Sequence, residues 1–257
     1  MLLKMPMTDI TPKNYTAPPH LLKDRIILVT GAGDGIGKAA AKAFADRGAT
    51  VILLGRTVAK LEQVYDDIRQ QGGPEPVIFP LCMETAVEAD YQHMADAIED
   101  QFGQLDGLLH NAGLLGQRTS IGNYQQAIWQ QVMQVNVTAA FLLTKATLPS
   151  LKASPDASIL FTSSGVGRHG RAFWGAYAVS KFAIEGLSQV LSNELEDVSN
   201  IRVNCINPGA TRTAMRAVAY PAENPSTLKS AEQIMPAYLY LMGPDSKGTN
   251  GQSVDAQ

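Results

Sequence analysis

Cysteine and histidine are scarce in this sequence of 257 residues. The two cysteines, Cys82 and Cys205, lie far apart, and the four histidines have no metal-ligand spacing to one another or to a cysteine. A disulfide-stabilised secreted fold and a zinc site are therefore not expected. We expect two free thiols, no bound metal and a cytoplasmic location, where thiols stay reduced.

Long hydrophobic runs and an excess of charge of one sign are also missing. No apolar stretch is long enough to span a bilayer, and the first residues lack the apolar core and cleavage site of a signal peptide. The formal net charge is −3, from 21 Lys and Arg and 24 Asp and Glu. Neither nucleic acid nor a membrane is therefore expected as a partner.

The sequence contains no linker, repeat or low-complexity tract that would divide it into several domains. Residues 1–23 are rich in Pro, Thr and Met, and we interpret them as an N-terminal extension that lies over the surface or is partly disordered. Residues 24–257 are interpreted as one domain, which is a common length for an α/β fold.

Short apolar runs alternate with helical patterns along this domain. Strands are expected at residues 25–30, 49–54, 76–81, 105–110, 157–162 and 201–206, and helices at 38–47, 57–71, 87–102, 126–148 and 175–196. Such alternation predicts right-handed crossovers and a parallel sheet covered on both faces. The predicted fold class is α/β, a single doubly wound domain of Rossmann type with about seven strands.

A glycine-rich turn joins the first expected strand to the first helix. Glycines let the backbone approach a pyrophosphate, and the helix N-terminus directs free N–H groups at it. A P-loop is excluded because Ala32 and Ala39 stand where it needs Gly and Ser or Thr, and Ile36 breaks the usual Gly-x-Gly-x-x-Gly spacing. The turn has the pattern Thr-Gly-x-x-x-Gly-Ile-Gly, and its candidate cofactor-binding residues are Thr30, Gly31, Gly33, Asp34, Gly35, Ile36 and Gly37.

A candidate catalytic set lies further along the chain. Tyr177 and Lys181 are four residues apart, so on a helix they share one face. An ammonium beside a phenol lowers the pKa of the tyrosine, which suits proton transfer. Ser164 lies thirteen residues before Tyr177, at the end of an expected strand, and this spacing favours it over Ser163. A lone Tyr-x-x-x-Lys pair is common on exposed helices. Here the candidate nucleotide site upstream favours a catalytic role for the pair.

These motifs, together with Asn111-Ala112-Gly113, Asn136-Val137 and Pro208-Gly209, follow the order and spacing of the short-chain dehydrogenase/reductase family. The chain resembles that family from about residue 24 to 213. The resemblance implies an enzyme that moves a hydride between a nicotinamide cofactor and a carbonyl or alcohol substrate.

The resemblance also implies a role for each candidate catalytic residue. Tyr177 would be the general acid for reduction, or the base for oxidation, and Lys181 would lower its pKa and bind the nicotinamide ribose. Ser164 would hold the substrate oxygen as charge develops on it. Asn136 would bind a water that relays protons from Lys181. His110, where the family usually has asparagine, is expected to satisfy neighbouring backbone groups instead of acting in catalysis.

Further cofactor contacts are implied at the ends of other strands. They are Asn111, Ala112 and Gly113 after the fourth strand, and Pro208, Gly209, Thr211 and Thr213 after the sixth. Thr213 matches the family's threonine that hydrogen-bonds the nicotinamide amide.

The second strand bears on the choice between NADP and NAD. A carboxylate at its end usually binds the ribose 2′-hydroxyl of NAD, but here Gly55 and Arg56 stand there, which favours the phosphate of NADP. Asp34 argues the other way, because NADP-dependent relatives often carry a basic residue in the glycine turn. Cys82 stands where the family has an acidic residue that accepts from adenine, and a thiol is a poor acceptor. NADP is predicted, with NAD as the alternative.

Substrate specificity and assembly are less well defined by the sequence. The segment 210–232 is interpreted as a substrate lid, and Arg168, His169 and Arg171 either attract an acidic substrate or form a solvated turn or subunit contact. The resemblance implies a homodimer or homotetramer built on the helices at 126–148 and 177–196. The alternatives are an NAD(H)-preferring alcohol dehydrogenase, a non-catalytic NAD(P)-binding regulatory protein, and epimerisation or dehydration at the same site.

Overall fold

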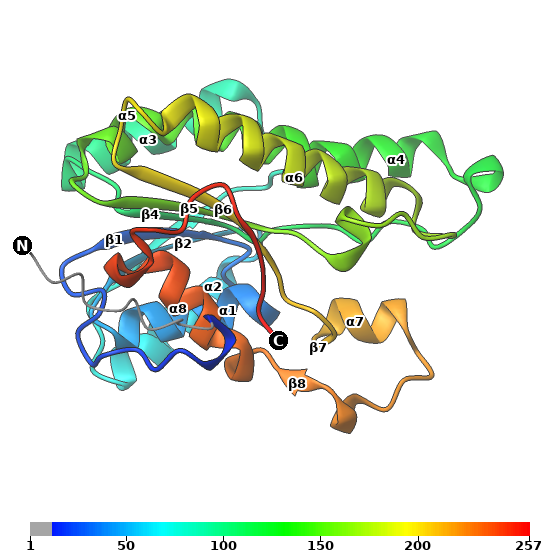
Figure 1. Ribbon diagram of the computed structural model, residues 1–257, viewed down its shortest axis with the longest axis horizontal. Helices are drawn as coiled ribbons and strands as arrows, with labels where there is room; N and C mark the ends of the chain where they lie inside the picture. Colours follow the sequence, from blue (N-terminus) through cyan, green and yellow to red (C-terminus); the bar gives the residue numbers. More distant parts are fainter. Residues whose placement is uncertain (1–11) are drawn as a thin grey trace, which may run out of the picture.

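A parallel sheet of seven strands forms the centre of the computed structural model, which describes residues 12–257. Its order is β3-β2-β1-β4-β5-β6-β9 (Figure 1). The strands are β1 (Ile26–Thr30), β2 (Thr50–Gly55), β3 (Val77–Pro80), β4 (Gly107–His110), β5 (Ala157–Thr162), β6 (Ile201–Asn207) and β9 (Ser253–Asp255). The order reverses between β1 and β4, which is the place where doubly wound sheets bind ligands. The predicted fold class is confirmed.

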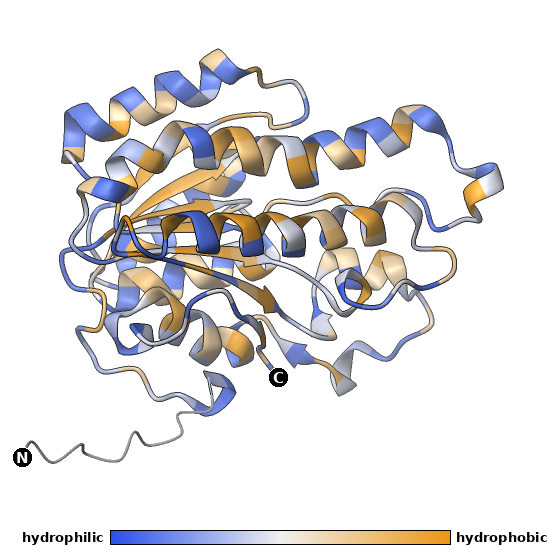
Figure 2. Ribbon diagram, turned by 45° about the horizontal axis from the view of Figure 1, so that its top comes forward, coloured by the Kyte–Doolittle hydropathy of each residue, from blue (hydrophilic) through white to orange (hydrophobic). Residues whose placement is uncertain are grey.

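Helices cover both faces of the sheet (Figure 1). One face carries α1 (Gly35–Asp46), α2 (Val58–Gln70) and α8 (Met235–Met242). The other carries α3 (Glu88–Phe102), α4 (Gln126–Met133), α5 (Ala139–Ala153) and α6 (Gly175–Leu195). The strands between these layers are hydrophobic along their length (Figure 2), as expected for strands buried on both faces.

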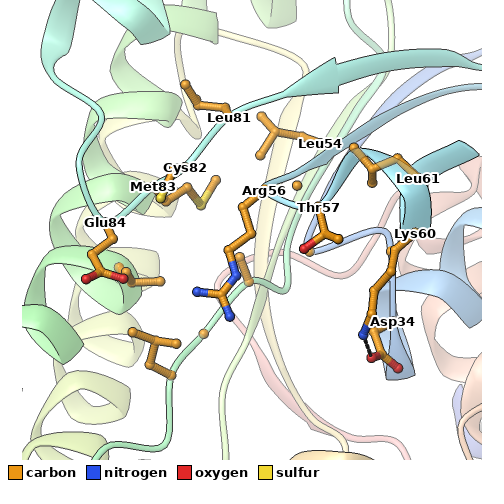
Figure 3. A pocket seen from close by; sticks show the side chains of 17 residues that line it. Asp34, Leu54, Arg56, Thr57, Lys60, Leu61, Leu81, Cys82, Met83 and Glu84 are labelled. Atoms are coloured by element: carbon orange, nitrogen blue, oxygen red, sulfur yellow. Dashed lines mark hydrogen bonds and ion pairs between the residues drawn. The ribbon is translucent and has the colours of Figure 1, made fainter.

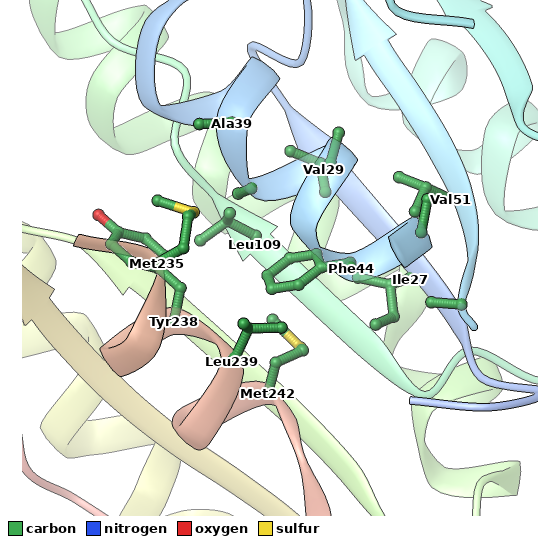
Figure 4. Packing of buried hydrophobic residues seen from close by; sticks show 14 of the residues in the cluster. Ile27, Val29, Ala39, Phe44, Val51, Leu109, Met235, Tyr238, Leu239 and Met242 are labelled. Carbon is green, nitrogen blue, oxygen red and sulfur yellow. The ribbon is translucent and has the colours of Figure 1, made fainter. Parts of the chain in front are cut away.

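Helix α8 is an element that the sequence pattern did not predict. Seven of its eight residues are buried, so it has no polar face and no helical periodicity to detect. It packs beside Phe44 of α1 over the sheet, with Tyr238 and Met242 facing Ile27 and Leu109 (Figure 4). The core on this face therefore depends on a segment close to the C-terminal strand.

The helix expected at 126–148 is longer than predicted and is not uniform. A π-helical segment, Gln134–Thr138, separates α4 from α5, and α5 continues through Pro149 to residue 153. Short π-helical segments inside α-helices are frequently found at functional sites. Asn136 lies within this one.

The predicted extension at residues 1–23 lies partly outside the described residues. From residue 12 onward it packs on the domain, since Leu22 is fully buried and Tyr15 contacts the ring of Tyr240 edge-on, with centroids 5.4 Å apart. The Tyr15 hydroxyl also donates to Asp245 at 2.6 Å. This part of the extension therefore contributes to the core.

A buried charge cluster ties the strands together at the end of the sheet where β1, β5 and β6 begin. Asp156 pairs with Arg25 at 3.0 Å and with Arg202, and all three side chains are mostly buried. Arg202 also donates to the carbonyl of Gly243 at 3.1 Å. We name this set, Arg25, Asp156 and Arg202, the basal cluster.

The remaining elements lie beyond the carboxyl end of β6. A small parallel pair, β7 (Thr211–Arg212) with β8 (Lys229–Ser230), flanks the short helix α7 (Ala214–Ala219). No helix within residues 12–257 is both long enough and apolar enough to cross a membrane. Both cysteines are free, and the cytoplasmic location stays a prediction.

Candidate active site

Two adjoining cavities open at the carboxyl ends of the strands, on either side of the glycine turn. The first, of about 280 Å³, lies against β2, β3 and the start of α2. The second, of about 450 Å³, extends past β4 and β5 to α6 and α7. They share Gly31, Asp34, Arg56, Ala112 and Gly113 in their walls. An elongated ligand can therefore lie across the point where the strand order reverses.

The glycine turn approaches the loop after β4 too closely for side chains. Gly31 has φ +66°, and a Cβ there would lie 3.1 Å from the Cα of Ala112. A Cβ on Gly37 would lie 2.2 Å from the carbonyl oxygen of Gly31. These two positions need glycine, and the backbone of the turn is left facing the cavities, as a pyrophosphate cradle requires.

Three of the predicted site residues lie behind the cavity walls instead of in them. The hydroxyl of Thr30 accepts from the backbone N–H groups of Asn111 at 2.9 Å and of Ala112 at 3.0 Å, so Thr30 fixes the loop after β4. Gly37 packs on the glycine turn, and Asn136 is buried. The other predicted site residues line one cavity or both.

Tyr177, Lys181 and Ser164 meet in the second cavity. The Ser164 side chain lies near enough to the Tyr177 hydroxyl to lower its pKa, whereas Ser163 is buried and its hydroxyl has no partner among the described residues. Lys181 is buried, and its Nζ donates to the carbonyl oxygen of Thr162 at 2.7 Å. The structure thus places Ser164, the serine favoured by spacing, against Tyr177.

The pKa values of this pair differ from the expectation. Burial raises the pKa of Tyr177 to about 12, and the nearby Ser164 side chain opposes this rise. The Lys181 ammonium lies 5.5 Å from the centre of the Tyr177 ring and points at Thr162, so it does not lower the pKa of the phenol in this arrangement. Burial lowers the pKa of Lys181 to about 8. The phenol is therefore protonated at neutral pH, ready to act as an acid.

Asn136 joins the π-helical segment to the loop after β4. Its Oδ1 accepts from the N–H of Leu114 at 2.7 Å, and its Nδ2 donates to the Leu114 carbonyl and to Ser180 Oγ. A cavity of about 10 Å³ beside it is lined by Lys181 and Thr162 among others. That volume is about what one water molecule needs. The predicted water relay stays a prediction, and its residues border a space of suitable size.

His110 has a side-chain partner, not the backbone partners that were expected. Its Nε2 lies 2.8 Å from Thr144 Oγ1, and its ring stacks on Phe161 with centroids 4.6 Å apart. Because Thr144 donates its own proton to the carbonyl of Ala140, Nε2 must be the protonated nitrogen. Burial lowers the pKa of His110 to about 3, so the ring is neutral near pH 7.

The first cavity contains two charged residues that the sequence analysis did not single out. Figure 3 shows the guanidinium of Arg56 between Glu84 on one side and the pair formed by Lys60 and Asp34 on the other. Glu84 lies two residues after Cys82 and accepts from Gln131 at 2.7 Å. Lys60 is the third residue of α2, four residues after Arg56 in sequence, and no motif in the sequence singles it out.

Helix α7 forms part of the wall of the second cavity, and the role of its segment as a lid stays a prediction. Tyr220, which follows the helix, is held between two cations: Arg216 lies 3.8 Å and Arg118 4.9 Å from its ring centre. Arg118 also lies 4.6 Å from the ring centre of Trp174, which precedes α6. Leu115, Trp174 and Ala219 line this cavity and pack in one apolar cluster with Tyr177.

The basic residues before α6 do not line either cavity within residues 12–257. Arg168 pairs with Asp255 at 2.7 Å and with Glu185 at 3.6 Å. It thereby ties the turn after Ser164 to β9. The structure therefore gives no support to the expectation that this stretch attracts an acidic substrate.

Gln257 is hydrogen-bonded to the wall of the second cavity that Pro208, Gly209 and Thr211 form. The Gln257 side-chain amide donates to the Pro208 carbonyl at 2.6 Å and contacts Thr211 Oγ1 at 3.3 Å. Thr213 lines the same cavity and caps α7 by accepting from the N–H of Arg216 at 3.1 Å. The described residues contain no cluster of three His, Cys, Asp or Glu side chains that could hold a metal ion.

Comparisons with known proteins agree with this arrangement. The family model described as short chain dehydrogenase matches residues 25–224. YciK, an uncharacterised oxidoreductase of Escherichia coli K12, is 53% identical over 244 residues, which cover 95% of this chain and 96% of YciK. A Pseudomonas syringae structure matches with TM-score 0.94 and 59% identity over 95% of this chain and 99% of its own. A Shigella flexneri 2a structure, solved in complex with NADP, matches with TM-score 0.91 and 53% identity over 93% of this chain and 100% of its own. The chain belongs to the short-chain dehydrogenase family.

Proposed function

We propose that this protein is an NADP(H)-dependent oxidoreductase that transfers a hydride between the nicotinamide and a carbonyl or alcohol substrate. The observation that carries the proposal is that Tyr177, Ser164 and Lys181 line the same cavity as the glycine turn. Family membership supports the reaction class, and the Shigella relative solved with NADP supports the cofactor.

The residues present fit a dinucleotide. The close packing at Gly31 and Gly37 leaves backbone in place of side chains along the middle of the site. In this proposal, Arg56 and its neighbours hold the adenosine end, and Asn111, Pro208, Thr211 and Thr213 hold the nicotinamide end. The bound cofactor would supply the hydride, and the protein would place the substrate and handle the proton.

In this proposal, Tyr177 exchanges a proton with the oxygen of the substrate. In reduction, the carbonyl carbon gains the hydride while its oxygen takes the proton of the Tyr177 hydroxyl. Ser164, which lines the same cavity near Tyr177, donates to the same oxygen as negative charge develops on it. A proton from solvent then restores the phenol, while Lys181, whose ammonium donates to the Thr162 carbonyl, would bind the nicotinamide ribose. Oxidation of an alcohol reverses these steps.

The test of this function is turnover by the purified protein. We expect NADPH absorbance to fall with at least one member of a panel of ketones, aldehydes, quinones and 3-oxoacyl thioesters. The apolar and aromatic wall around Tyr177 favours the less polar members. Tight NADPH binding without turnover of any compound would instead support a non-catalytic regulatory protein.

Arg56 provides a test of cofactor choice. Its side chain makes no ion pair or hydrogen bond to residues 12–257 and lines both cavities, so it is free to bind an anion. Arg56→Ala is expected to raise the Kd for NADPH about tenfold or more, because a charge-assisted hydrogen bond to the 2′-phosphate is lost. Isothermal titration with NADPH and NADH measures this.

The control for Arg56 is Arg69→Ala, which removes the same charge from the far end of α2, outside both cavities. It is expected to leave both affinities unchanged. If Arg56→Ala barely alters NADPH binding while NADH binds better than NADPH, the cofactor assignment is wrong and the NAD(H)-preferring alternative stands.

The proposal includes a homodimer or homotetramer built on the helices at 126–148 and 177–196, which correspond to α4, α5 and α6. Exposed apolar side chains on α5 and α6 support it: Phe141, Val179, Phe182 and Val190. Sedimentation is expected to give a particle of two or four chains, and Phe182→Glu should shift it toward single chains. A wild-type protein that sediments as a single chain at micromolar concentration would contradict this assembly.

A further inference from the structure

An exposed ion pair borders the first cavity beside Arg56. Lys60 Nζ lies 2.5 Å from Asp34 Oδ2, and both residues line the cavity (Figure 3). The two side chains are 55% and 62% exposed, so the pair adds little to stability. Its position at the cavity mouth calls for a different explanation.

The local backbone brings this pair together. Asp34 is the N-cap of α1, and its Oδ1 accepts from the N–H of Gly35 at 2.7 Å, which fixes the carboxylate. Gly33 lets the first turn of α2 approach, since a Cβ there would lie only 3.0 Å from the Cβ of Lys60. The second oxygen of Asp34 is thus placed to receive the ammonium.

The charges at this mouth matter for a phosphate ligand. A phosphate monoester carries a charge of about −1.5 to −2 at neutral pH, so an unpaired Asp34 carboxylate would repel it. Lys60 cancels that charge, and its ammonium has three donors, of which Asp34 uses one. Arg56 supplies a second cation at the same cavity, and no carboxylate ends β2, where Gly55 stands.

We propose that Lys60 is a second cofactor-specificity residue, which binds the 2′-phosphate of NADP(H) together with Arg56 while it neutralises Asp34. This inference rests on the proposed function, because it assumes that the adenosine end lies in the first cavity. NADP-dependent relatives often carry a basic residue in the glycine turn. Here Asp34 occupies the turn and holds the ammonium of Lys60, which α2 supplies. Loss of Lys60 exposes an acidic group that repels the phosphate and accepts from a ribose hydroxyl.

The test is equilibrium binding by calorimetry of two probes that lack the nicotinamide, 2′,5′-ADP and 5′-AMP. Lys60→Ala is expected to raise the Kd for 2′,5′-ADP roughly tenfold or more and to leave that for 5′-AMP within about twofold. Lys60→Ala combined with Asp34→Asn should recover part of the lost affinity, because the uncompensated carboxylate is gone. The matched control is Lys42→Ala, which removes a lysine paired with Asp67 at 3.0 Å outside the cavity.

The outcomes separate this inference from the proposed function. If wild-type protein prefers 2′,5′-ADP but Lys60→Ala binds it as tightly as wild type, the role of Lys60 is refuted while NADP(H) use stands. A double variant no better than Lys60→Ala refutes the repulsion by Asp34. If wild type binds 2′,5′-ADP no more tightly than 5′-AMP, the cofactor assignment fails and the inference fails with it.

Discussion

Tyr177→Phe is expected to lower kcat for carbonyl reduction by a factor of about 10² to 10⁴, the usual range for loss of a general acid. The variant keeps the ring that packs on Trp174, with centroids 5.6 Å apart, and removes only the hydroxyl near Ser164. NADPH affinity should therefore stay within about twofold of wild type. Steady-state kinetics together with calorimetric titration of NADPH separate the two effects.

The control for this variant is Tyr65→Phe, which removes a hydroxyl that donates to Glu75 at 2.8 Å, outside both cavities. It should leave kcat unchanged. A Tyr177→Phe protein that turns over at the wild-type rate would refute the proposed proton donor and would leave Ser164 or a bound water as the source.

Asp156→Ala is expected to lower the free energy of unfolding by about 3–5 kcal/mol, because it leaves two mostly buried arginines of the basal cluster without their counter-charge. Arg25 directly precedes β1 and Arg202 lies in β6, so their repulsion would act between strands that are not neighbours in the sheet. Urea unfolding followed by circular dichroism measures the change. The active-site cavities lie at the other end of the strands, so residual folded protein should still bind NADPH.

The stabilisation that Asp156 provides is expected to decrease in acid. Burial alone would raise the pKa of Asp156, but hydrogen bonds and charge from Arg202 and Arg25 outweigh it and hold the pKa below its usual range. A depressed folded-state pKa stabilises the protein above the unfolded value, about 3.9, and this stabilisation is lost as the pH falls through the folded pKa. The difference between wild type and Asp156→Ala should therefore be constant near pH 7 and shrink in acid.

Lys145→Ala is the comparison for Asp156, because Lys145 and Glu88 form an exposed pair at 2.7 Å. A loss below about 1 kcal/mol is expected there. An Asp156→Ala protein as stable as Lys145→Ala would show that the basal cluster contributes no more than a surface pair.

The parts of the structure that could be predicted from the sequence are those that a short stretch of residues determines by itself. The buried strand before the glycine turn, the glycine spacing of the turn itself, and the one-turn spacing of Tyr177 and Lys181 each follow from short stretches of chain. Their meeting in one cavity follows from the parallel sheet, whose strand ends gather at one edge. The family resemblance and the fold class were confirmed, whereas the roles of the site residues stay predictions.

The parts that could not be predicted depend on contacts between distant segments. Helix α8 was not predicted because burial on all sides removes its hydrophobic periodicity. Lys60 was not singled out because a lysine in the first turn of a helix is ordinarily solvated. The pKa of Tyr177 was expected to fall because of Lys181. Burial raises this pKa instead, and the Lys181 ammonium donates to the carbonyl of Thr162. Asn136 was placed in a helix correctly, while the π-helical segment around it depends on tertiary contacts.

The most direct test of the proposed reaction follows a labelled hydrogen. NADPH carrying deuterium at the transferable position of the nicotinamide is incubated with the protein and the best carbonyl substrate, and the alcohol is examined by mass spectrometry. The account predicts one deuterium on the former carbonyl carbon of each product molecule, with NADP⁺ formed in equal amount. Product that forms without the label, or without oxidation of NADPH, would contradict hydride transfer and would favour epimerisation or dehydration at the same site.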